Sequence, residues 1–274
     1  MTTSDEREPT CYFASDGEDR FVPTGWTRGP WDARFQHGGP PSALLGRALA
    51  RAVASEPHEP ARFWIELRRP VPIRPLRVVV EAVRIGRSTS TASATLLDGE
   101  TELVRASALF VRHADLALDA ARLPGVAAFE PQPSPETVRS FSMPFFRHPV
   151  GYHASIDLRI ARGTWARGPV LAWLRARCAV VEGETPTPLE RVLIAADSVH
   201  GVAPPLDMDV FSFVNPDLAV HLSRLARGEW VALDAWTAAE PTGVGIARST
   251  LYDADGPIGA TLQSLVIAPR APSP

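Results

Sequence analysis

Apolar and polar positions along the chain follow the same order of patterns twice. In each block, a stretch with apolar residues at helical spacing precedes stretches in which apolar and polar residues alternate, as in half-buried strands. The first block predicts a helix over residues 40–54 and strands near 62–69, 76–87, 90–97 and 103–112. The second block predicts a helix in TPLERVLIAADSV and strands near 218–225, 230–240, 244–253 and 258–267.

A shift of 157 residues lays one block on the other without a gap, so that Phe35–Val111 falls on Val192–Ala268. Under this shift the Asp98-Gly99 pair, a typical hairpin turn, falls on Asp255-Gly256. Two more strand-like stretches, YHASIDLRIA and PVLAWLRARCAV, precede the second helix, and CYFAS and DRFVPT are their candidate counterparts near the N-terminus. The pattern therefore predicts two copies of one unit.

In both copies the strands follow the helix instead of alternating with further helices, which favours an α+β fold over a parallel sheet. A helix wrapped by its own antiparallel sheet is typical of the hot-dog fold. Two copies joined edge to edge would form a double hot-dog with one continuous sheet and fewer open edges. We expect an N-terminal repeat over residues 1–113, a proline-broken connection over 114–148 and a C-terminal repeat over 149–274.

The second helix begins with an explicit start signal. Thr187 can cap it, Pro188 suits the first helical position, and Glu190 completes a capping box. Asp197 lies one turn beyond Leu193, on nearly the same face as the apolar stripe. A carboxylate buried there is costly without partners, and burial raises its pKa. Two interpretations stay open, a buried functional acid or a helix-end residue that reaches solvent.

Two amide side chains are further candidates for a polar site. Alternation places Gln263 on one face of the last strand with Thr261 and Leu265, so it is buried if that face covers the helix. The same side chain could equally face water at a strand edge. Asn215 precedes the stretch DLAVHL, and in an Asn-Pro pair its default role is in a turn.

The two halves of the chain differ in these candidate polar residues. The shift places Asp197 on Pro40, Gln263 on Ala106 and, more loosely, Asn215 on His58. The first half thus has no carboxylate where the second half has one. We therefore expect one working site per chain, with its polar residues in the second half.

Composition excludes several classes of function. A formal net charge of −3 over 274 residues provides no electrostatic footprint for nucleic acid or an anionic membrane. Cys11 and Cys178 stand alone and the histidines have no ligand spacing, so we expect neither a disulfide nor a metal site. Without GxGxxG, GxxxxGK[ST] or GxSxG motifs, we expect no cofactor and no α/β-hydrolase. No apolar run could span a membrane, and the acidic start is unlike a signal peptide, so a cytoplasmic protein is expected.

Four stretches carry a resemblance to known proteins: HGGPPSALLGRAL, RPVPIRPLRVVVEAVRIGRSTSTASATLLDGE, AADSV and GPIGATLQSLVIAPR. Together they make the chain similar to the acyl-CoA thioesterase II-like family of double hot-dog proteins over nearly its whole length. The resemblance implies that an acyl-CoA substrate is hydrolysed to a free acid and CoA, through one water held by an Asp, a Thr or Ser, and a Gln. The Asp matches Asp197, the Gln matches Gln263, and the hydroxyl residue matches Asn215. That last position departs from the family, although an amide can also hold a water by hydrogen bonds.

The stretch HGGPPSALLGRAL places two glycines at the start of the first helix. Thioester hydrolysis needs donors aimed at the oxygen that becomes negative, and a helix N-terminus supplies amides at its positive dipole end. Because Pro40 and Pro41 lack amide hydrogens, the donors must come before them or from Ser42, and we expect the amides of Gly38 and Gly39 to contact the substrate. The alternative is a tight loop that needs glycine for its dihedral angles alone.

Two other functions stay open. A catalytically silent acyl-CoA-binding or lipid-binding protein would share the fold without the chemistry, and the departure at Asn215 favours it. FVNPDLAVH also resembles the Asp-x-Asn-Pro-Leu-His stretch of hot-dog enoyl-CoA hydratases, but here the acid, Asp217, follows the proline. The sequence is compatible with a homo-oligomer and does not specify one.

Overall fold

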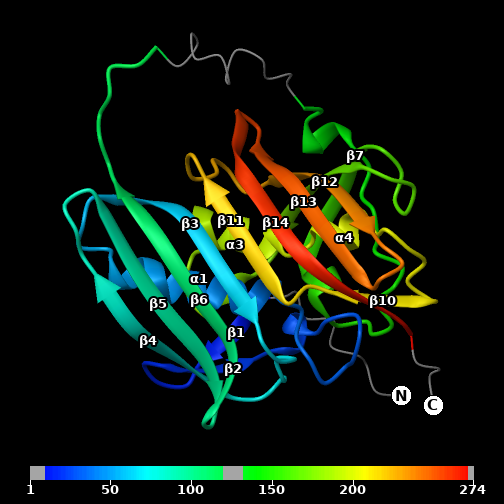
Figure 1. Ribbon diagram of the computed structural model, residues 1–274, viewed down its shortest axis with the longest axis horizontal. Helices are drawn as coiled ribbons and strands as arrows, with labels where there is room; N and C mark the ends of the chain where they lie inside the picture. The colour runs from blue at the N-terminus through cyan, green and yellow to red at the C-terminus, as the bar shows by residue number, and fades with distance from the viewer. Residues whose placement is uncertain (1–9, 120–131, 271–274) are drawn as a thin grey trace.

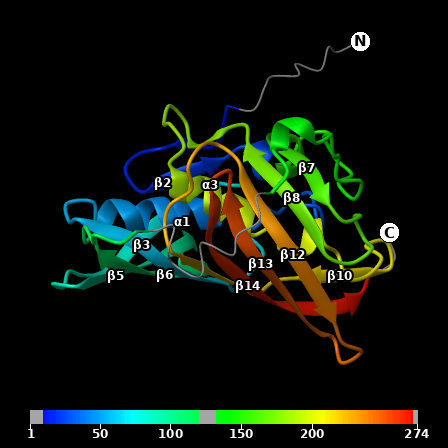
Figure 2. The same ribbon diagram turned by 90° about the horizontal axis from the view of Figure 1, so that it is seen from above.

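The computed structural model describes residues 10–119 and 132–270, which form a 14-stranded sheet with helices on one of its faces (Figures 1 and 2). The helices are α1 (Gly39–Ala52), α3 (Pro188–Ala196) and α4 (Val199–Val202), with 3-10 turns at Gly25–Thr27, Pro135–Thr137 and Tyr152–Ser155. The strands are β1 (Cys11–Ser15), β2 (Arg20–Pro23), β3 (His58–Leu67), β4 (Leu76–Arg84), β5 (Thr89–Asp98), β6 (Thr101–Arg112), β7 (Ile156–Arg162), β8 (Val170–Ala176), β9 (Ala179–Val181), β10 (Phe211–Val214), β11 (Asp217–Leu222), β12 (Val231–Ala239), β13 (Val244–Asp253) and β14 (Gly256–Pro269). The expected connection over 114–148 lies partly outside the described residues, so its boundaries stay a prediction.

The strands follow the order β7-β8-β12-β13-β14-β11-β3-β6-β5-β4-β2-β1-β9, with β10 paired to β14. At the centre β3 and β11 are antiparallel neighbours, with Trp64 opposite Ala219. On one side of this pair follow β6, β5 and β4, and on the other side β14, β13 and β12. The two blocks of the sequence therefore share one sheet, and neither leaves its central strand as an open edge.

Both predicted helices and the strands predicted for the two blocks are present, with ends displaced by a few residues. The capping box of α3 is also confirmed. The Thr187 amide donates to Glu190 Oε2 at 2.8 Å, and the Glu190 amide donates to Thr187 Oγ1 at 3.3 Å. At the first hairpin turn Gly99 has φ +58°, a left-handed conformation that glycine adopts without strain.

The single strand expected in PVLAWLRARCAV is wrong, because this stretch forms two strands. β8 pairs with β12, whereas β9 runs parallel to β1 at the far end of the sheet, with Ala179 opposite Cys11. The break falls directly after Arg177, whose amide donates to the Ser155 carbonyl oxygen at 2.8 Å and so makes the last bond in register with the β7–β8 pair. This crossover ties the second block to the first, and it makes the sheet mixed instead of antiparallel throughout.

The 157-residue shift holds for the strands but not for the helices. It moves β6 onto residues 258–269, within β14, but it moves α1 onto residues 196–209, whereas α3 spans 188–196. The reason is that the second block has a much longer connection between its helix and its central strand, which an ungapped shift cannot follow. The inferred equivalence of Asp197 with Pro40 is therefore wrong.

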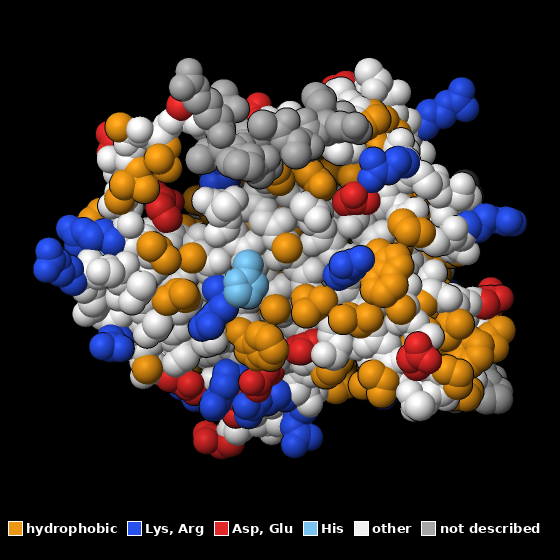
Figure 3. All heavy atoms as spheres, turned by 45° about the horizontal axis from the view of Figure 1, so that its top comes forward, with side chains coloured by type: hydrophobic (Ala, Val, Ile, Leu, Met, Phe, Trp, Pro, Cys, Tyr) orange, Lys and Arg blue, Asp and Glu red, His pale blue; other side chains and the backbone are white. Residues whose placement is uncertain are grey.

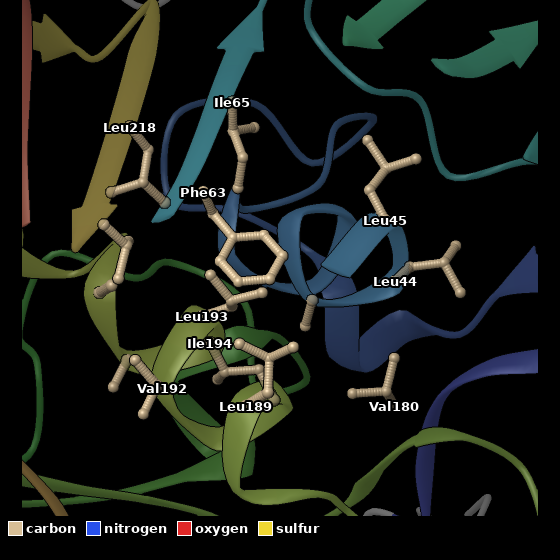
Figure 4. Close-up of a cluster of buried hydrophobic side chains, with 14 of the residues drawn as sticks. Leu44, Leu45, Phe63, Ile65, Val180, Leu189, Val192, Leu193, Ile194 and Leu218 are labelled. Atoms are coloured by element: carbon tan, nitrogen blue, oxygen red, sulfur yellow. The ribbon is translucent and has the colours of Figure 1, made fainter. Parts of the chain in front are cut away.

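The core lies between the sheet and the two longer helices (Figure 4). Phe63 and Ile65 of β3, Leu218 of β11 and Leu193 of α3 meet there, and all four side chains are fully buried. A Cβ at Gly46 of α1 would overlap the side chain of Leu193, so the two helices cross at a distance that only glycine permits. This crossing brings the start of α1 close to the end of α3.

The outer face of the sheet carries scattered hydrophobic side chains among charged ones (Figure 3). Along β14 the alternation is as expected, since Leu262 and Val266 are exposed whereas Thr261, Gln263 and Leu265 are buried. Gln263 therefore faces the helices, and the strand-edge alternative is wrong. In the described part of the chain, no helix has the length and apolar character needed to cross a membrane.

Candidate active site

A cavity of about 440 Å³ lies where the start of α1 meets the end of α3. Most of its wall is apolar or aromatic, formed by Trp31, Phe35, Leu67, Val71, Met143, Phe145, Phe146, Met208 and Val214. The wall also carries Asp197 with the polar side chains of His37, Ser198, His200 and Asn215. An apolar cavity with a few convergent polar groups is typical of a small-molecule site.

Asp197 is the C-terminal cap residue of α3 and is 2% exposed, so the alternative of a solvent-reaching helix end is wrong. Its Oδ1 accepts a hydrogen bond from Asn215 Nδ2 at 2.8 Å. Its Oδ2 lies 3.1 Å from Nδ1 of His37. The structure thus brings Asp197 and Asn215 together as expected, and it adds His37 from the first block. The expectation that the polar residues all come from the second half is wrong, because the crossing helices build the site from both.

The two glycines at the start of α1 are packed against the same carboxylate. A Cβ at Gly38 would lie 2.8 Å from Asp197 Oδ2 and 3.0 Å from Oδ1. A Cβ at Gly39 would lie 2.8 Å from the Ile194 carbonyl oxygen. Gly38 has φ −69°, and neither glycine has a positive φ. Lack of space, and not an unusual dihedral angle, therefore requires glycine here, so the dihedral alternative is wrong.

The amides of Gly38 and Gly39 face the Asp197 carboxylate and lower its pKa, and the Gly39 amide is shared with Nδ1 of His37. α1 has no side-chain N-cap, and the Ser42 amide is already bound to the Gly38 carbonyl oxygen at 3.1 Å. Asp197 therefore occupies the place that a capping side chain usually takes, although it comes from another helix. Its negative charge also faces the positive end of the α1 dipole.

Asp197 and His37 have strongly shifted pKa values. Burial raises the pKa of Asp197 to about 7, against the lowering effect of the hydrogen bonds from Asn215 and the two glycine amides. Burial lowers the pKa of His37 to about 3, with a further contribution from His200. At neutral pH the imidazole is therefore uncharged and the carboxyl group is about half ionised. This is the range in which a carboxylate is an effective general base.

The imidazole of His37 is held in a fixed orientation. It stacks on Tyr152, with ring centroids 3.7 Å apart and planes 5° from parallel. Tyr152 Oη donates to the Ile194 carbonyl oxygen at 2.8 Å. The Gly39 amide donates to Nδ1 of His37 at 3.1 Å, so the neutral ring carries its proton on Nε2, and Nδ1 faces the Asp197 carboxyl group as an acceptor. When Asp197 is protonated, its hydroxyl group can donate to Nδ1.

Sequence reasoning missed His37. Its side chain belongs to the first block, and its partner Asp197 belongs to the second, so no spacing within either block connects them. The available signal was its position directly before Gly38 and Gly39, at the start of a buried helix.

Gln263 is buried as expected, but the structure describes no hydrogen bond between it and Asp197. Its Oε1 lies 3.1 Å from His200 Nδ1, and its Nε2 donates to the Ala196 carbonyl oxygen at 3.5 Å. His200 is the member of this pair that lies on the cavity wall. Gln263 therefore lies behind His200, next to the residue that precedes Asp197.

Asp217, the acid of the hydratase-like stretch, lies on the other side of the sheet. Its carboxylate accepts hydrogen bonds from the amide of Ser264 at 2.6 Å and from the hydroxyl group of Ser264 at 3.2 Å. Ser264 is exposed, and Asp217 does not line the cavity. The hydratase interpretation needs Asp217 in the cavity, and the structure does not place it there.

Two domain families match the chain. The acyl-CoA thioesterase N-terminal domain matches residues 27–111, and the acyl-CoA thioesterase C-terminal domain matches residues 121–267. No curated protein matches the chain.

Solved structures show the same fold over most of the chain. A protein assigned provisionally as a thioesterase, from Novosphingobium aromaticivorans DSM 12444, has 18% identity and a TM-score of 0.68, covering 93% of this chain and 98% of that one. A conserved hot-dog protein of unknown function from Alicyclobacillus acidocaldarius has 18% identity and a TM-score of 0.65, covering 95% and 96%. Acyl-CoA thioesterase II TesB2 from Mycobacterium marinum has 16% identity and a TM-score of 0.61, covering 86% and 91%. At these identities the likeness shows the fold alone, which is the hot-dog fold.

Proposed function

Since the chain belongs to the acyl-CoA thioesterase family and is a thioester hydrolase, we propose that it cleaves a fatty or other acyl-CoA to a free acid and CoA through a water held by Asp197, Asn215 and Gln263. The acyl group lies along the aromatic and apolar wall of the cavity, where its burial removes apolar surface from water. The thioester group lies at the polar end of the cavity, beside Asp197.

Asp197 is the general base of this proposal. In the structure, the amides of Gly38 and Gly39 donate to its carboxylate. When the thioester enters, its carbonyl oxygen accepts the hydrogen bonds of these two amides. The lone pairs that this exchange frees on the carboxylate then accept a hydrogen bond from the water. The glycines therefore serve the acid and the substrate in turn, which supports their expected contact with the substrate.

The reaction follows from these positions. The water oxygen attacks the carbonyl carbon while its proton passes to Asp197, and the developing oxyanion is stabilised by the Gly38 and Gly39 amides at the positive end of α1. The carbon–sulfur bond then breaks, and the proton moves from Asp197 to the sulfur of the leaving group. The products are a carboxylic acid and the CoA thiol, and the carboxylate is restored.

Three side chains support the base. His37 stays neutral, and its Nδ1 lies 3.1 Å from Oδ2 of Asp197, which keeps the carboxyl group in place. Asn215 Nδ2 donates a hydrogen bond to Oδ1 of Asp197. The carbonyl oxygen of the same side chain can accept a hydrogen bond from the other O–H group of the water. Gln263 orients His200 on the cavity wall, and we propose that it acts on the water through this contact.

The observation that carries this proposal is a buried carboxyl group with a pKa of about 7, placed at the N-terminus of α1 on the wall of an apolar cavity. The test is to incubate the protein with short-, medium- and long-chain acyl-CoAs and to follow the release of free thiol. We expect release well above the spontaneous rate for at least one chain length, and loss of that release in Asp197→Asn.

A second candidate function is binding of acyl-CoA without hydrolysis. The hydrogen bonds from Asn215 and the two glycine amides favour it, because they occupy lone pairs on Asp197 that a water would need. Asn215 at the position of the family's hydroxyl residue also favours it. Saturable binding across the panel without thiol release would support this candidate and contradict the thioesterase proposal.

We also propose that the fold is a double hot-dog made of two tandem repeats, over residues 1–113 and 149–274, with the connection over 114–148. The support is the order of the strands, which runs outward in the same way from both sides of the β3–β11 pair. Each repeat supplies one of the two crossing helices.

A further inference from the structure

One arginine on the cavity wall lacks an acidic partner. Arg68 and Arg69 both line the cavity. Arg68 pairs with Glu66 at 2.7 Å and with Glu102 at 3.1 Å. Arg69 is exposed, and its side chain makes no ion pair or hydrogen bond with any residue that the structure describes. A cation without a counterion beside an otherwise apolar cavity is suited to an anionic ligand.

A second hollow of about 500 Å³ adjoins the cavity and is basic in character. It is lined by Arg28, Arg34 and Arg74, together with Ala33, Phe35, Pro72 and Ile73. The ring of Phe35 belongs to the walls of both hollows. A ligand that extends out of the cavity past Phe35 therefore enters a groove bordered by arginines.

The arginines lie on two segments that are joined by backbone hydrogen bonds. The Gln36 amide donates to the Val71 carbonyl oxygen at 2.8 Å, and the Ile73 amide donates to the Arg34 carbonyl oxygen at 3.0 Å. Residues 34–36 and 71–73 therefore run side by side, so Arg69, on the cavity wall, and Arg34 and Arg74, on the wall of the adjoining hollow, lie on or beside one paired segment.

Two of the groove arginines keep donors free for a ligand. The Arg34 side chain is 79% exposed and uses Nε and Nη2 for Asp32, which leaves the Nη1 donors. Arg74 pairs with Asp98 through Nη2 and is also well exposed. Because a guanidinium carries five N–H donors, a carboxylate partner on one edge leaves the other edge for a phosphate. Arg28 differs, since it donates to two backbone carbonyl groups and is structural.

We propose that Arg69, with Arg34 and Arg74, binds the phosphate groups of the CoA moiety at the rim of the cavity. This inference rests on the proposed function, because it takes the substrate to be an acyl-CoA. Such a molecule is apolar at its acyl end and carries a pyrophosphate and a ribose phosphate at its other end. The site has the same polarity, with an aromatic cavity at Asp197 and arginines along the rim.

The test compares an acyl-CoA with the S-acyl pantetheine that carries the same acyl group and no nucleotide phosphates. For Arg69→Ala we expect KM for the acyl-CoA to rise about three- to tenfold, with kcat unchanged, and the Arg34→Ala/Arg69→Ala double variant to raise it further. KM for the acyl pantetheine should change in neither variant. Arg87→Ala is the matched control, since this exposed arginine lies in the hairpin at the opposite end of β4 from Arg74.

Three other results would each overturn the inference. An unchanged KM for the acyl-CoA shows that the rim does not bind phosphate. An equal rise for both substrates shows that Arg69 acts on the acyl or pantetheine part. A rise confined to a dicarboxylic acyl-CoA shows that it recognises an acyl carboxylate.

Direct binding separates this inference from the thioesterase proposal. If the parent protein hydrolyses neither substrate, the proposed function fails, but calorimetric titration with free CoA and with pantetheine still tests the rim. We expect parent protein to bind CoA more tightly than pantetheine, Arg69→Ala to reduce that difference, and added salt to weaken CoA binding alone. Equal affinity of the parent for CoA and pantetheine would overturn the phosphate assignment.

Discussion

The two longer helices begin in opposite ways. α3 begins with its own capping box, in which Thr187 and Glu190 satisfy each other's backbone amides. α1 begins with Gly38 and Gly39 and has no side-chain cap. Its free amides are satisfied instead by Asp197, the residue that ends α3. The start of α3 is complete within its own sequence, whereas the start of α1 depends on a residue from the second block.

This difference indicates where chemistry can occur. Amides bound by a local side chain, as in α3, are unavailable to a ligand and serve stability alone. Amides bound by a carboxylate from elsewhere can be passed to a substrate oxygen when that carboxylate changes partners. The five predictions below concern each helix start, or the acid between them, and are arranged from the largest expected effect to the smallest.

Asp197→Asn should have the largest effect on activity. The side chain keeps its shape and can still hydrogen-bond a water, but it cannot take the water's proton. Because general-base catalysis contributes roughly 10²–10⁴-fold, the rate of thioester hydrolysis should fall by about that factor. Initial rates and the melting temperature check this, with Asp217→Asn as the control, since the Asp217 carboxylate lies on the outer face of the sheet. A folded Asp197→Asn protein with parental rates would remove Asp197 from the role of base.

Gly38→Ala should reduce the rate about 10- to 100-fold. The added Cβ would lie within 3.0 Å of both Asp197 oxygens, so the carboxylate has to move, and displacement of a catalytic group by about 1 Å can cost that much. We also expect a lower melting temperature, since Leu67 is equally close to the new atom. Steady-state kinetics at a temperature well below the transition separates the two effects. Parental kcat/KM in a destabilised protein would show that the close approach is structural only.

The pH dependence of the parent should follow Asp197. With its pKa at about 7, kcat/KM should rise about tenfold per pH unit below pH 7 and level off above it. His37, with its pKa at about 3, stays neutral throughout this range. A rate that is flat between pH 5 and about pH 8 would contradict the assignment.

The melting temperature of the parent should also depend on the ionisation of Asp197, but stability should fall over the pH range in which activity rises. The folded-state pKa of Asp197 is raised above the unfolded value of about 3.9, so the folded state holds a proton that the unfolded state has released. The stability from this group is therefore fully present below about pH 4 and is lost as pH rises through 7. Asp197→Asn cannot lose a proton, so its melting temperature relative to that of the parent should increase between pH 5 and 8.

Thr187→Ala should have the smallest effect on activity. It removes the side-chain acceptor of the α3 capping box and should lower the free energy of unfolding by about 1 kcal/mol. Because this cap lies at the far end of α3 from Asp197, kcat/KM should stay within about twofold of the parent. Urea unfolding and steady-state kinetics on the same preparation measure both. A loss of rate as large as that of Gly38→Ala would mean that the two helix starts do not differ as described.

Much of the fold could be predicted, because local patterns carried it. Strict alternation located Gln263 on the inward face of β14, and the Thr187–Glu190 signal located the start of α3. The break between β8 and β9 could not be predicted, since no glycine, proline or turn signal interrupts residues 170–181. What separates the two strands is their pairing, because β8 pairs with β7 and β12 whereas β9 pairs with β1.

The sequence by itself determined the class of fold and the two-block organisation, and it singled out Asp197 as the candidate acid, because each depends on periodicity or on a short motif. The tertiary structure decided what surrounds that acid. Asp197 meets His37 and the two glycine amides only because α1 and α3 cross at Gly46, where any side chain would collide with Leu193. The pKa of the carboxyl group follows from this burial and from its donors, among them the two glycine amides of the first block. Contacts of this kind depend on how two elements pack, and spacing along one element does not record them.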